Sequence, residues 1–545
     1  MQSTPRSLRP WRPCLSALSA AGLLALLVVI GLPGGREAAA QLPEARQSFI
    51  VVMTDDQGPG MMRALPSVRR LLGGSGVTFE NAVASYPLCC PSRATFLTGQ
   101  YAHNHGAKGN TRGSGGAYQS LIDPERNLAA WLDAAGYDTA FAGKWLNGLR
   151  SPRTAPPGWD EWTGLVGAGG EGLSSYYDFD VFAGPGKSRH FGSAAPDYQT
   201  DALTREYALP FVAAHATDPD PFFLWLSLHP PHDGLGRLDA AGRRCSRDRP
   251  DQRGGGQSAI PPARYASRFM RARVPRPPSF DERDLSDKPG FVARRDPIDE
   301  GTLEKIDRSY RCGLAALLSV DDAVAGLVAE LRTAGRLEST TIVFTADQGI
   351  LAGEHRLLGK NLPYEEAIRV PLVVRSPGVR AGTVNAEPVV NADLAPTILE
   401  LAGVGVPDEL ARVLDGVSLR ATMQGDESLA GRAILLEGRK EAVRARRGFK
   451  VRSYVGVRTA RYTYVEHRRA RVTSRAEGLE LEIGAGRTTD IELYDLRRDP
   501  YQLESRDRDA TYTAARRTLA GLLGRLEHCA GADCAITATV PRPGR

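Results

Sequence analysis

Four short, mostly apolar runs are spaced along the chain, and each is followed by polar residues. The runs are Phe49–Met53, Thr139–Gly143, Phe222–Leu228 and Thr341–Phe344. Runs of this length are typical of strands that are buried on both faces of a parallel sheet. Just before the last run, Leu303–Ala334 shows helical spacing, which predicts a helix that covers the sheet. The pattern therefore predicts an α/β protein.

The polar ends of these runs are the first candidates for chemistry, because ligands of open α/β sheets bind beyond the carboxyl ends of strands. Asp55 and Asp56 follow the first run, and Asp347 and Gln348 follow the last. Alone, an Asp pair after a strand is more often a turn with a helix cap. Two similar strand ends weigh against that interpretation, since adjacent carboxylates repel unless a cation lies between them. Oxygen ligands of this kind predict calcium or magnesium rather than zinc or copper.

The stretch Tyr86–Gln100 (YPLCCPSRATFLTGQ) predicts an anion site with an available sulfur. Pro91 suits the first turn of a helix, where its missing N–H costs nothing. Cys89 and Cys90 then lie at the helix N-terminus, where free N–H groups and the macrodipole favour an anion. Arg93, one turn along, can direct a forked cation to the same anion. The alternative is a vicinal cysteine pair that acts as a buried spacer or forms a disulfide.

Basic side chains occur at further strand ends. Lys144 follows the second run, His232 follows the third, and Lys360 comes shortly after the last. Each of them alone is more often a surface or packing residue. Together they would neutralise charge on the oxygens of a transferring group, and a histidine can move protons near neutral pH.

These motifs resemble those of a known family. Cys89-Cys90-Pro91-Ser92-Arg93, followed by Leu97-Thr98-Gly99, is similar to the C-x-P-S-R…L-T-G signature of the sulfatases, and the other motifs follow in the sulfatase order from about Phe49 to Ser505. The resemblance implies an alkaline-phosphatase-like fold with a large central sheet flanked by helices. It also implies that a formylglycine-generating enzyme converts Cys89 to formylglycine (3-oxoalanine), whose hydrate is the nucleophile.

The resemblance assigns roles to the candidate residues as well. It implies one Ca²⁺ per chain, held by Asp55, Asp56, Asp347 and Gln348 together with the residue made from Cys89. It implies that the basic residues stabilise charge or manage the leaving group of a sulfate ester; these residues are Arg93, Lys144, His232 and Lys360. Gln348 departs from the usual asparagine, and its extra methylene shifts the ligating oxygen.

A narrower resemblance concerns Ala142–Gly148, which is similar to the A-G-K-x-L-N motif of N-acetylglucosamine-6-sulfatases and extracellular heparan sulfate endosulfatases. It implies a sulfated sugar such as N-acetylglucosamine 6-sulfate, or an aryl sulfate, as the substrate. It also makes Asn147 and His105 candidates for substrate binding. Many sulfatases have a histidine where this chain has Leu146, so no catalytic role is predicted there.

The sequence divides into three parts. A signal peptide is predicted over residues 1–40, because arginines are followed by the apolar run Leu15–Leu32 and then by Ala38-Ala39-Ala40. The alternative is a retained membrane anchor. A catalytic α/β domain is predicted over 41–430, with an irregular Arg-, Pro- and Gly-rich insertion over 234–299. Residues 431–545 predict a smaller α+β subdomain, with an antiparallel sheet and a final helix at Thr513–Leu526.

Export and partners follow from these features. We expect a secreted protein, which can stay at the cell surface but has no stable membrane insertion after cleavage. Cys529 and Cys534 could close a small disulfide loop in an oxidising compartment, whereas a zinc pair would need two more ligands. The net charge of +6 suits an anionic substrate only weakly, and no nucleic-acid partner is expected.

Two other functions compete with a sulfatase. A phosphodiester or phosphonate monoester hydrolase could share the fold, because fold does not fix function. A catalytically silent binding protein could keep the scaffold, but intact Cys89, Arg93, Lys144 and Lys360 argue against it.

Overall fold

The computed structural model describes residues 46–111, 116–149, 154–166, 176–184, 187–218, 220–234, 258–405, 412–439, 450–475, 478–481 and 486–544. The signal peptide predicted for residues 1–40 lies outside these ranges, and so does segment 235–257 of the predicted insertion.

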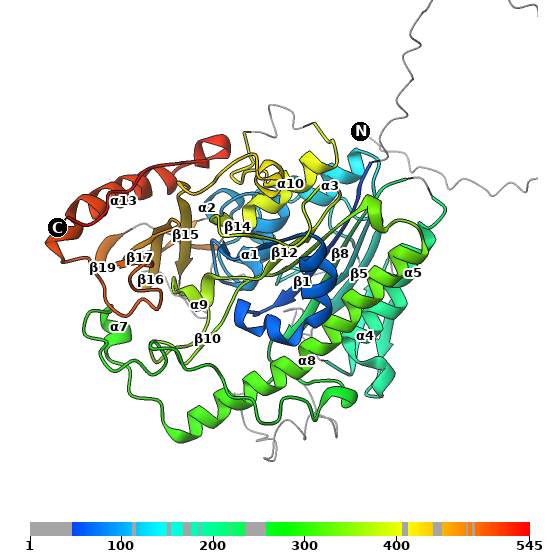
Figure 1. Ribbon diagram of the computed structural model, residues 1–545, viewed down its shortest axis with the longest axis horizontal. Helices are drawn as coiled ribbons and strands as arrows, with labels where there is room; N and C mark the ends of the chain where they lie inside the picture. Colours follow the sequence, from blue (N-terminus) through cyan, green and yellow to red (C-terminus); the bar gives the residue numbers. More distant parts are fainter. Residues whose placement is uncertain are drawn as a thin grey trace, which may run out of the picture. The chain divides into compact units, whose positions relative to one another are not determined.

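A ten-stranded sheet forms the centre of the protein, in the order β13-β2-β12-β9-β1-β8-β4-β5-β6-β7 (Figure 1). Its middle strands are mutually parallel; they are β9 (Thr340–Ala346), β1 (Ser48–Asp55), β8 (Phe222–Pro231) and β4 (Asp138–Gly143). These strands contain the four apolar runs, so the predicted α/β sheet is confirmed. The outer strands are β13 (Thr383–Asn385), β2 (Val77–Phe79), β12 (Leu372–Arg375), β5 (Glu161–Val166), β6 (Phe179–Ala183) and β7 (Ser188–Phe191).

Both faces of the sheet are covered, which explains why the middle strands are apolar without alternation. Phe49, Val51 and Met53 of β1 pack into one hydrophobic cluster, whereas Ile50 and Val52 pack into another. The first cluster includes side chains of α1 (Cys89–Thr98), α3 (Leu128–Ala134) and α10 (Leu394–Leu401). The second includes side chains of α4 (Gln199–Leu203), α5 (Leu209–Ala214) and α8 (Glu300–Thr333).

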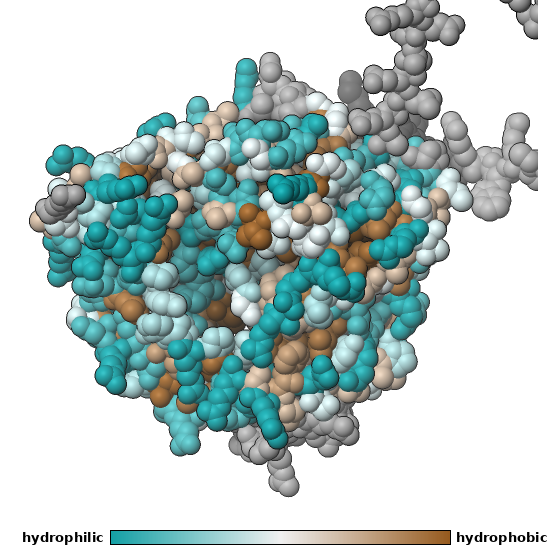
Figure 2. Space-filling view, viewed as in Figure 1, coloured by the Kyte–Doolittle hydropathy of each residue, from teal (hydrophilic) through white to brown (hydrophobic). Residues whose placement is uncertain are grey.

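The long helix α8 is the one predicted at Leu303–Ala334. It begins after Asp299, whose side chain caps the helix by accepting a hydrogen bond from the backbone N–H of Thr302 at 2.8 Å. By length and composition it could cross a membrane, but 72% of its most apolar window is buried inside the protein. It is therefore a core helix, and it crosses the face of the molecule drawn in Figure 2, where apolar and hydrophilic side chains are interspersed.

Shorter elements connect these layers. They are β3 (Ala82–Val83), α2 (Ala102–His105), α7 (Gly290–Ala293), β10 (Leu351–Ala352), β11 (Leu358–Gly359), α9 (Glu365–Ile368), β14 (Val389–Val390) and α12 (Arg420–Gln424). The described part of the insertion, residues 258–299, is irregular. It still contributes Ile260, Val274, Leu285 and Val292 to the buried interior, so packing rather than secondary structure orders it.

A second, five-stranded antiparallel sheet lies near the C-terminus. Its strands are β15 (Ile434–Arg439), β16 (Lys450–Arg458), β17 (Tyr462–Arg475), β18 (Gly478–Leu481) and β19 (Arg487–Asp495). Helix α13 (Thr513–Leu526) packs on it through Leu519 and Leu523, as the sequence predicted. The same hydrophobic cluster includes Val83 and Ile368, which precede residue 431 in the chain. The domain boundary at residue 431 therefore stays a prediction.

Candidate active site

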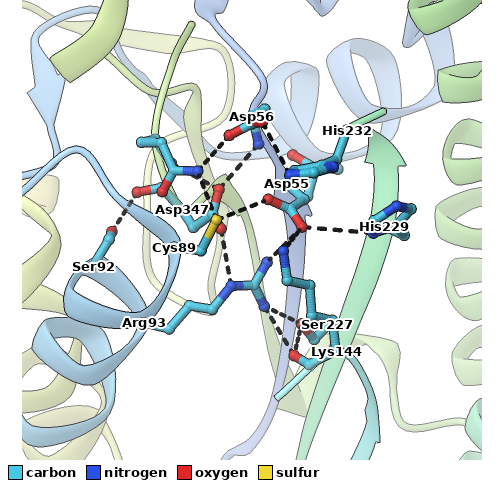
Figure 3. Close-up of polar contacts among 12 residues, drawn as sticks. Asp55, Asp56, Cys89, Ser92, Arg93, Lys144, Ser227, His229, His232 and Asp347 are labelled. Atoms are coloured by element: carbon cyan, nitrogen blue, oxygen red, sulfur yellow. Dashed lines mark hydrogen bonds and ion pairs between the residues drawn. The ribbon is translucent and has the colours of Figure 1, made fainter. Parts of the chain in front are cut away.

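Polar side chains from neighbouring strands meet at one edge of the central sheet (Figure 3). Asp55 is the last residue of β1, Asp347 and Lys144 directly follow β9 and β4, and His232 directly follows β8. Because these strands are parallel and adjacent, their carboxyl ends lie side by side, and residues far apart in the sequence come into contact. The site is thus a consequence of strand order.

Helix α1 is fixed against these strand ends. It ends at Gly99, whose φ of 68° favours glycine, and a Cβ there would lie 2.6 Å from Cδ2 of Leu414. Ser92 donates a hydrogen bond from its hydroxyl to the backbone oxygen of Asp347. The amide of Asn391 in turn donates to Oγ of Ser92 at 3.0 Å. These contacts hold the N-terminus of α1 toward the acidic cluster.

The first residue of α1, Cys89, lies in the centre of the cluster. Its Sγ is 3.0 Å from Nζ of Lys360, 3.5 Å from Nε2 of Gln348 and 3.7 Å from Oδ1 of Asp55, and the residue is 2% exposed. Cys90 is also buried, and neither cysteine is part of a disulfide. A disulfide between them, one of the two alternatives from the sequence, is therefore not formed.

Arg93 connects two of the acidic strand ends. It is fully buried; its Nε donates to Oδ2 of Asp347 at 2.9 Å, and its Nη2 lies 3.7 Å from Oδ2 of Asp55. Nη1 donates to the backbone oxygen of Lys144 at 2.9 Å and to the hydroxyl of Ser227. The guanidinium thus fixes three strand ends relative to one another.

Asp55 is a fully buried carboxylate that stays ionised. Burial by itself would raise its pKa, but the positive charges of Lys144, His232 and Arg93 lower the pKa of Asp55 well below its ordinary value. Nζ of Lys144 contacts Oδ2 of Asp55 directly. Burial lowers the pKa of Lys144, and Asp55 more than compensates, so that the pKa of this lysine is raised.

The second carboxylate, Asp56, contacts the remaining basic groups. Nζ of Lys360 lies 2.6 Å from Oδ1 and 2.8 Å from Oδ2 of Asp56. Nε2 of His232 is 3.5 Å from Oδ2 of Asp56, and its Nδ1 is 2.7 Å from Asp233. Nδ1 of His229 lies 3.7 Å from Oδ2 of Asp55. Two histidines therefore approach the acidic pair from β8.

The donor set fits a hard divalent cation. Potential ligand atoms of four residues lie within 4.8 Å of one another: Asp55, Asp56, Cys89 and His232. Oε1 of Gln348 is buried and has no hydrogen-bond partner among the described residues, while its Nε2 faces Asp56. The oxygen and nitrogen of such an amide are assigned from its contacts, so the same side chain can present its oxygen instead. With Asp347 adjacent, the carboxylates of Asp55 and Asp56 and the amide of Gln348 offer the hard oxygens that calcium or magnesium prefers.

The two residues named as candidates for substrate binding lie against α1, His105 beside Thr95 and Asn147 beside Cys90. The ring nitrogens of His105 contact Oγ1 of Thr95 and the backbone N–H of Ala107, both at 3.1 Å, and burial lowers the pKa of His105 to about 3. This neutral, internally bonded histidine has no ring nitrogen free for a substrate. Asn147 is also largely buried, and its Oδ1 has no hydrogen-bond partner in the described part of the chain.

Three residues that support the site were assigned no individual role from the sequence. They are Ser227, which bonds to Arg93; His229, which approaches Asp55; and Asn391, which bonds to Ser92. A lone polar residue inside the apolar run of β8 was a usable signal for Ser227. Nothing local marks Asn391, because its role depends on a contact across 299 residues.

A pocket of about 520 Å³ opens beside the cluster. Asp56, His232 and Lys360 line its inner end, and residues of α8 and of the segment 350–359 line most of the rest. The face drawn in Figure 2 is hollowed between the regions that Figure 1 labels β10 and α8. A small anionic group at the inner end would thus meet Lys360, with room beyond it for the group to which it is attached.

Comparisons with known proteins identify the family of the chain. The sequence model of the Sulfatase family matches residues 47–404, and that described as N-sulphoglucosamine sulphohydrolase, C-terminal, matches residues 353–528. The human N-acetylglucosamine-6-sulfatase is 30% identical over 446 residues, which are 80% of this chain and 73% of that protein. An arylsulfatase of Volvox carteri is 29% identical over 540 residues, 93% of this chain and 79% of that protein.

Two solved structures show the same fold. One is a protein in complex with its substrate D-glucosamine-2-N,6-O-disulfate, with a TM-score of 0.67 at 23% identity over 88% of this chain and 97% of that one. The other is a phosphonate monoester hydrolase from Silicibacter pomeroyi, with a TM-score of 0.62 at 21% identity over 92% and 99% of the two chains. At these identities the likeness concerns the fold alone.

The fold is thus alkaline-phosphatase-like, and the protein is a hydrolase of anionic esters. The family model covers well over half of the chain, and the human relative is similar over most of its own length. The chain belongs to the sulfatase family, and the reaction class is sulfuric ester hydrolysis.

Proposed function

We propose that the protein is an exported sulfatase that hydrolyses sulfate esters of sugars, with a formylglycine made from Cys89 and one bound calcium. The observation that carries the proposal is the position of Cys89. Its Sγ lies at the start of α1, between Lys360, Gln348 and Asp55. A formylglycine hydrate at this position would supply the attacking hydroxyl.

Residues around Cys89 have roles that follow from charge and reach. Arg93 and Lys144 place two buried cations beside Asp55, and together with Lys360 they balance the charge of the sulfate oxygens. His232 lies close to Asp56 and lines the pocket. It is therefore positioned to donate a proton to the departing alcohol oxygen. A calcium held by Asp55, Asp56, Asp347 and Gln348 would supply Lewis-acid polarisation of the sulfate group.

Export is part of the proposal. Cys529 and Cys534 form a disulfide, and such bonds persist mainly in oxidising compartments outside the cytosol. The N-terminal signal expected from the sequence gives the same location. The proposed formylglycine at Cys89 also requires a formylglycine-generating enzyme as a partner during maturation.

A sulfated sugar is proposed as the substrate, with an N-acetylglucosamine 6-sulfate ester preferred to an aryl sulfate. The motif around Asn147 and the similarity to the human N-acetylglucosamine-6-sulfatase support this choice. Oδ1 of Asn147 is buried and has no hydrogen-bond partner among the described residues. A sugar hydroxyl could donate a hydrogen bond to this oxygen. Sites built to hydrogen-bond a substrate discriminate strongly against analogues that leave those groups unpaired. The phosphonate hydrolase alternative is supported only by likeness of fold.

The proposal is tested on protein expressed with a formylglycine-generating enzyme. Peptide mass spectrometry should show the conversion of thiol to aldehyde at Cys89 and not at Cys90. Cys89→Ala should abolish sulfate release. Cys90→Ala removes the neighbouring buried thiol and should retain activity in the folded fraction, which makes it the matched control. Full activity with unmodified Cys89 would refute the mechanism.

The substrate assignment needs a separate comparison. Sugar and aryl esters should be matched for leaving-group pKa, because an acidic phenol departs easily whatever its fit. The glucosamine 6-sulfate should then have the higher kcat/KM, and Asn147→Ala should lower it selectively. An aryl ester that remains the better substrate, with equal effects of Asn147→Ala on both, would leave only a general sulfatase.

A further inference from the structure

The pocket beside Cys89 has two unlike walls. One wall is a single stripe of α8, because its residues recur at helical spacing. These residues are Thr302, Lys305, Ile306, Ser309, Tyr310 and Gly313. The facing wall is formed by Ile350 and by residues of the β10–β11 hairpin, including Leu358. The pocket therefore extends along α8 from the acidic cluster.

Lys305 lies far from the reacting end of this stripe. Gly313 marks the inner end, since a Cβ there would lie 3.2 Å from Cβ of Pro231, the neighbour of His232. Gly313 lies eight positions after Lys305 on the helix, which corresponds to about 12 Å along the axis. Lys305 therefore lies toward the outer end of the stripe, away from the acidic cluster.

The charges of the pocket leave Lys305 distinct. Lys360 is paired with Asp56, and His232 is paired with Asp233. Lys305 has no ion-pair or hydrogen-bond partner among the residues that the structure describes, and it is exposed. A ligand that fills the pocket thus meets one uncompensated positive charge beyond the catalytic groups.

The wall opposite α8 is apolar. Ile350 is 37% exposed and Leu358 is 57% exposed, and they are two of five large apolar side chains exposed in the described part of the chain. Exposed apolar residues gathered in one concave site indicate a surface that a ligand covers. The carbon-bound face of a sugar ring can pack against such a wall.

We propose, resting on the sulfatase function proposed above, that this pocket is the leaving-group subsite and that Lys305 binds a second anionic group on the alcohol. The alcohol packs against Ile350 and Leu358, while its carboxylate or second sulfate pairs with Lys305. The enzyme then prefers esters of anionic saccharides to the same esters on neutral saccharides. Lys305 is a specificity-determining residue in this arrangement and takes no part in the chemical step.

The test uses two disaccharides that carry the same glucosamine 6-sulfate ester. One contains a uronate, and the other is its carboxyl-reduced, neutral counterpart. Wild-type enzyme should hydrolyse the uronate form with a kcat/KM about three- to tenfold higher, as expected for a partly exposed ion pair. The difference should lie in KM and should shrink at high ionic strength, because salt screens exposed charges.

Three variants isolate the charge. Lys305→Gln should reduce the ratio of kcat/KM values for the uronate and neutral disaccharides to about one, without changing kcat on the neutral disaccharide. Lys305→Arg should preserve the ratio of the wild-type enzyme. Lys187→Gln makes the identical change on an exposed lysine just before β7 and should leave the preference intact. Thermal unfolding of each variant checks that the fold is retained.

The outcomes separate the two proposals. Equal hydrolysis of both disaccharides by wild-type enzyme, or an equal loss on both in Lys305→Gln, would overturn the role of Lys305 while the sulfatase function stands. No sulfate release from any ester, with formylglycine verified at Cys89, would overturn the proposed function and this inference with it.

Discussion

Three carboxylates and three fixed cations meet around Cys89. Asp55, Asp56 and Asp347 are countered by Arg93, Lys144 and Lys360 through the contacts described. The balance is close to neutral before any ligand binds. A divalent cation would make the cluster net positive, which suits the singly charged sulfate ester. The metal and the substrate should therefore bind cooperatively.

Removal of the divalent cation is expected to destabilise the protein. A chelator should lower Tm, and calcium should restore it; at a hundredfold excess over Kd, binding contributes about 2.7 kcal/mol. Elemental analysis after dialysis should find one calcium per chain. Asp56→Asn should abolish the response of Tm to calcium, whereas Asp123→Asn, on an exposed residue far from the cluster in sequence, should keep it. Stoichiometric zinc would contradict this assignment.

At the same scale, the sequence indicates the residues that lie next to a recognisable pattern. Asp55, Asp347 and Lys144 follow apolar runs within one to three residues, so their positions at the ends of strands could be predicted from the sequence. The orientation of Gln348, with Nε2 toward Asp56, could not, since it depends on which atom meets the neighbouring charges. His105 also could not be placed, because its ring is turned into the protein by Thr95 and Ala107.

The β10–β11 hairpin is the element that carries Lys360, and the irregular segment 277–282 holds it. The backbone N–H of Asp281 donates to the oxygen of Gly353 at 2.9 Å, and that of His355 donates to the oxygen of Ser279 at 2.7 Å. The buried ring of His355 bonds to Glu282 at 2.6 Å. Part of the insertion is thus a support for a candidate catalytic residue.

Loss of the carboxylate at Glu282 should weaken this support. Glu282→Ala leaves the buried Nδ1 of His355 without its partner, so the free energy of unfolding should fall by about 2–3 kcal/mol. The kcat of the folded enzyme should also fall, because the hairpin that holds Lys360 is supported less firmly. Glu282→Gln keeps a hydrogen-bonding side chain and should lose less. Arg283→Ala, at the exposed next residue, is the control, and an equal loss in that variant would argue against a specific role for Glu282.

Regular elements were easier to predict than this segment. The helix Thr513–Leu526 and the four middle strands have strong apolar periodicity, and the structure forms them within a few residues of the predicted bounds. Residues 258–299 have little apolar periodicity. Long-range contacts, such as that of Glu282 with His355, hold this segment in place instead. Such contacts leave no pattern in the local sequence.

On the scale of the whole molecule, His103 joins the catalytic part to the C-terminal part. Its Nδ1 is 3.1 Å from Oε1 of Glu437 on β15, and its Nε2 is 2.9 Å from the backbone oxygen of Cys529. Both ring nitrogens face acceptors, so the imidazolium form fits. Burial opposes that form, but Glu437 outweighs it and raises the pKa of His103 to about 9.

This contact should make stability depend on pH. The folded-state pKa is above the unfolded value near 6.5, so the stabilisation is fully present below pH 6.5 and is lost as pH rises through about 9. Denaturant unfolding should show a loss of up to about 3 kcal/mol over that window. His103→Gln should be less stable at pH 6.5 and nearly flat across the same range. An unchanged slope in that variant would assign the pH dependence to other groups.

The burial of Cys89 imposes an order of events on biosynthesis. The residue is 2% exposed, and the groups that enclose it come from Gln348 and Lys360, more than 250 residues later in the chain. Under the maturation proposed above, a formylglycine-generating enzyme would have to reach the thiol before those segments fold over it. Under that proposal, each molecule has one interval, between synthesis and folding, in which Cys89 can be modified. Treatment of the folded protein with that enzyme should leave Cys89 unmodified. The active fraction would then depend on the rate of modification relative to the rate of folding.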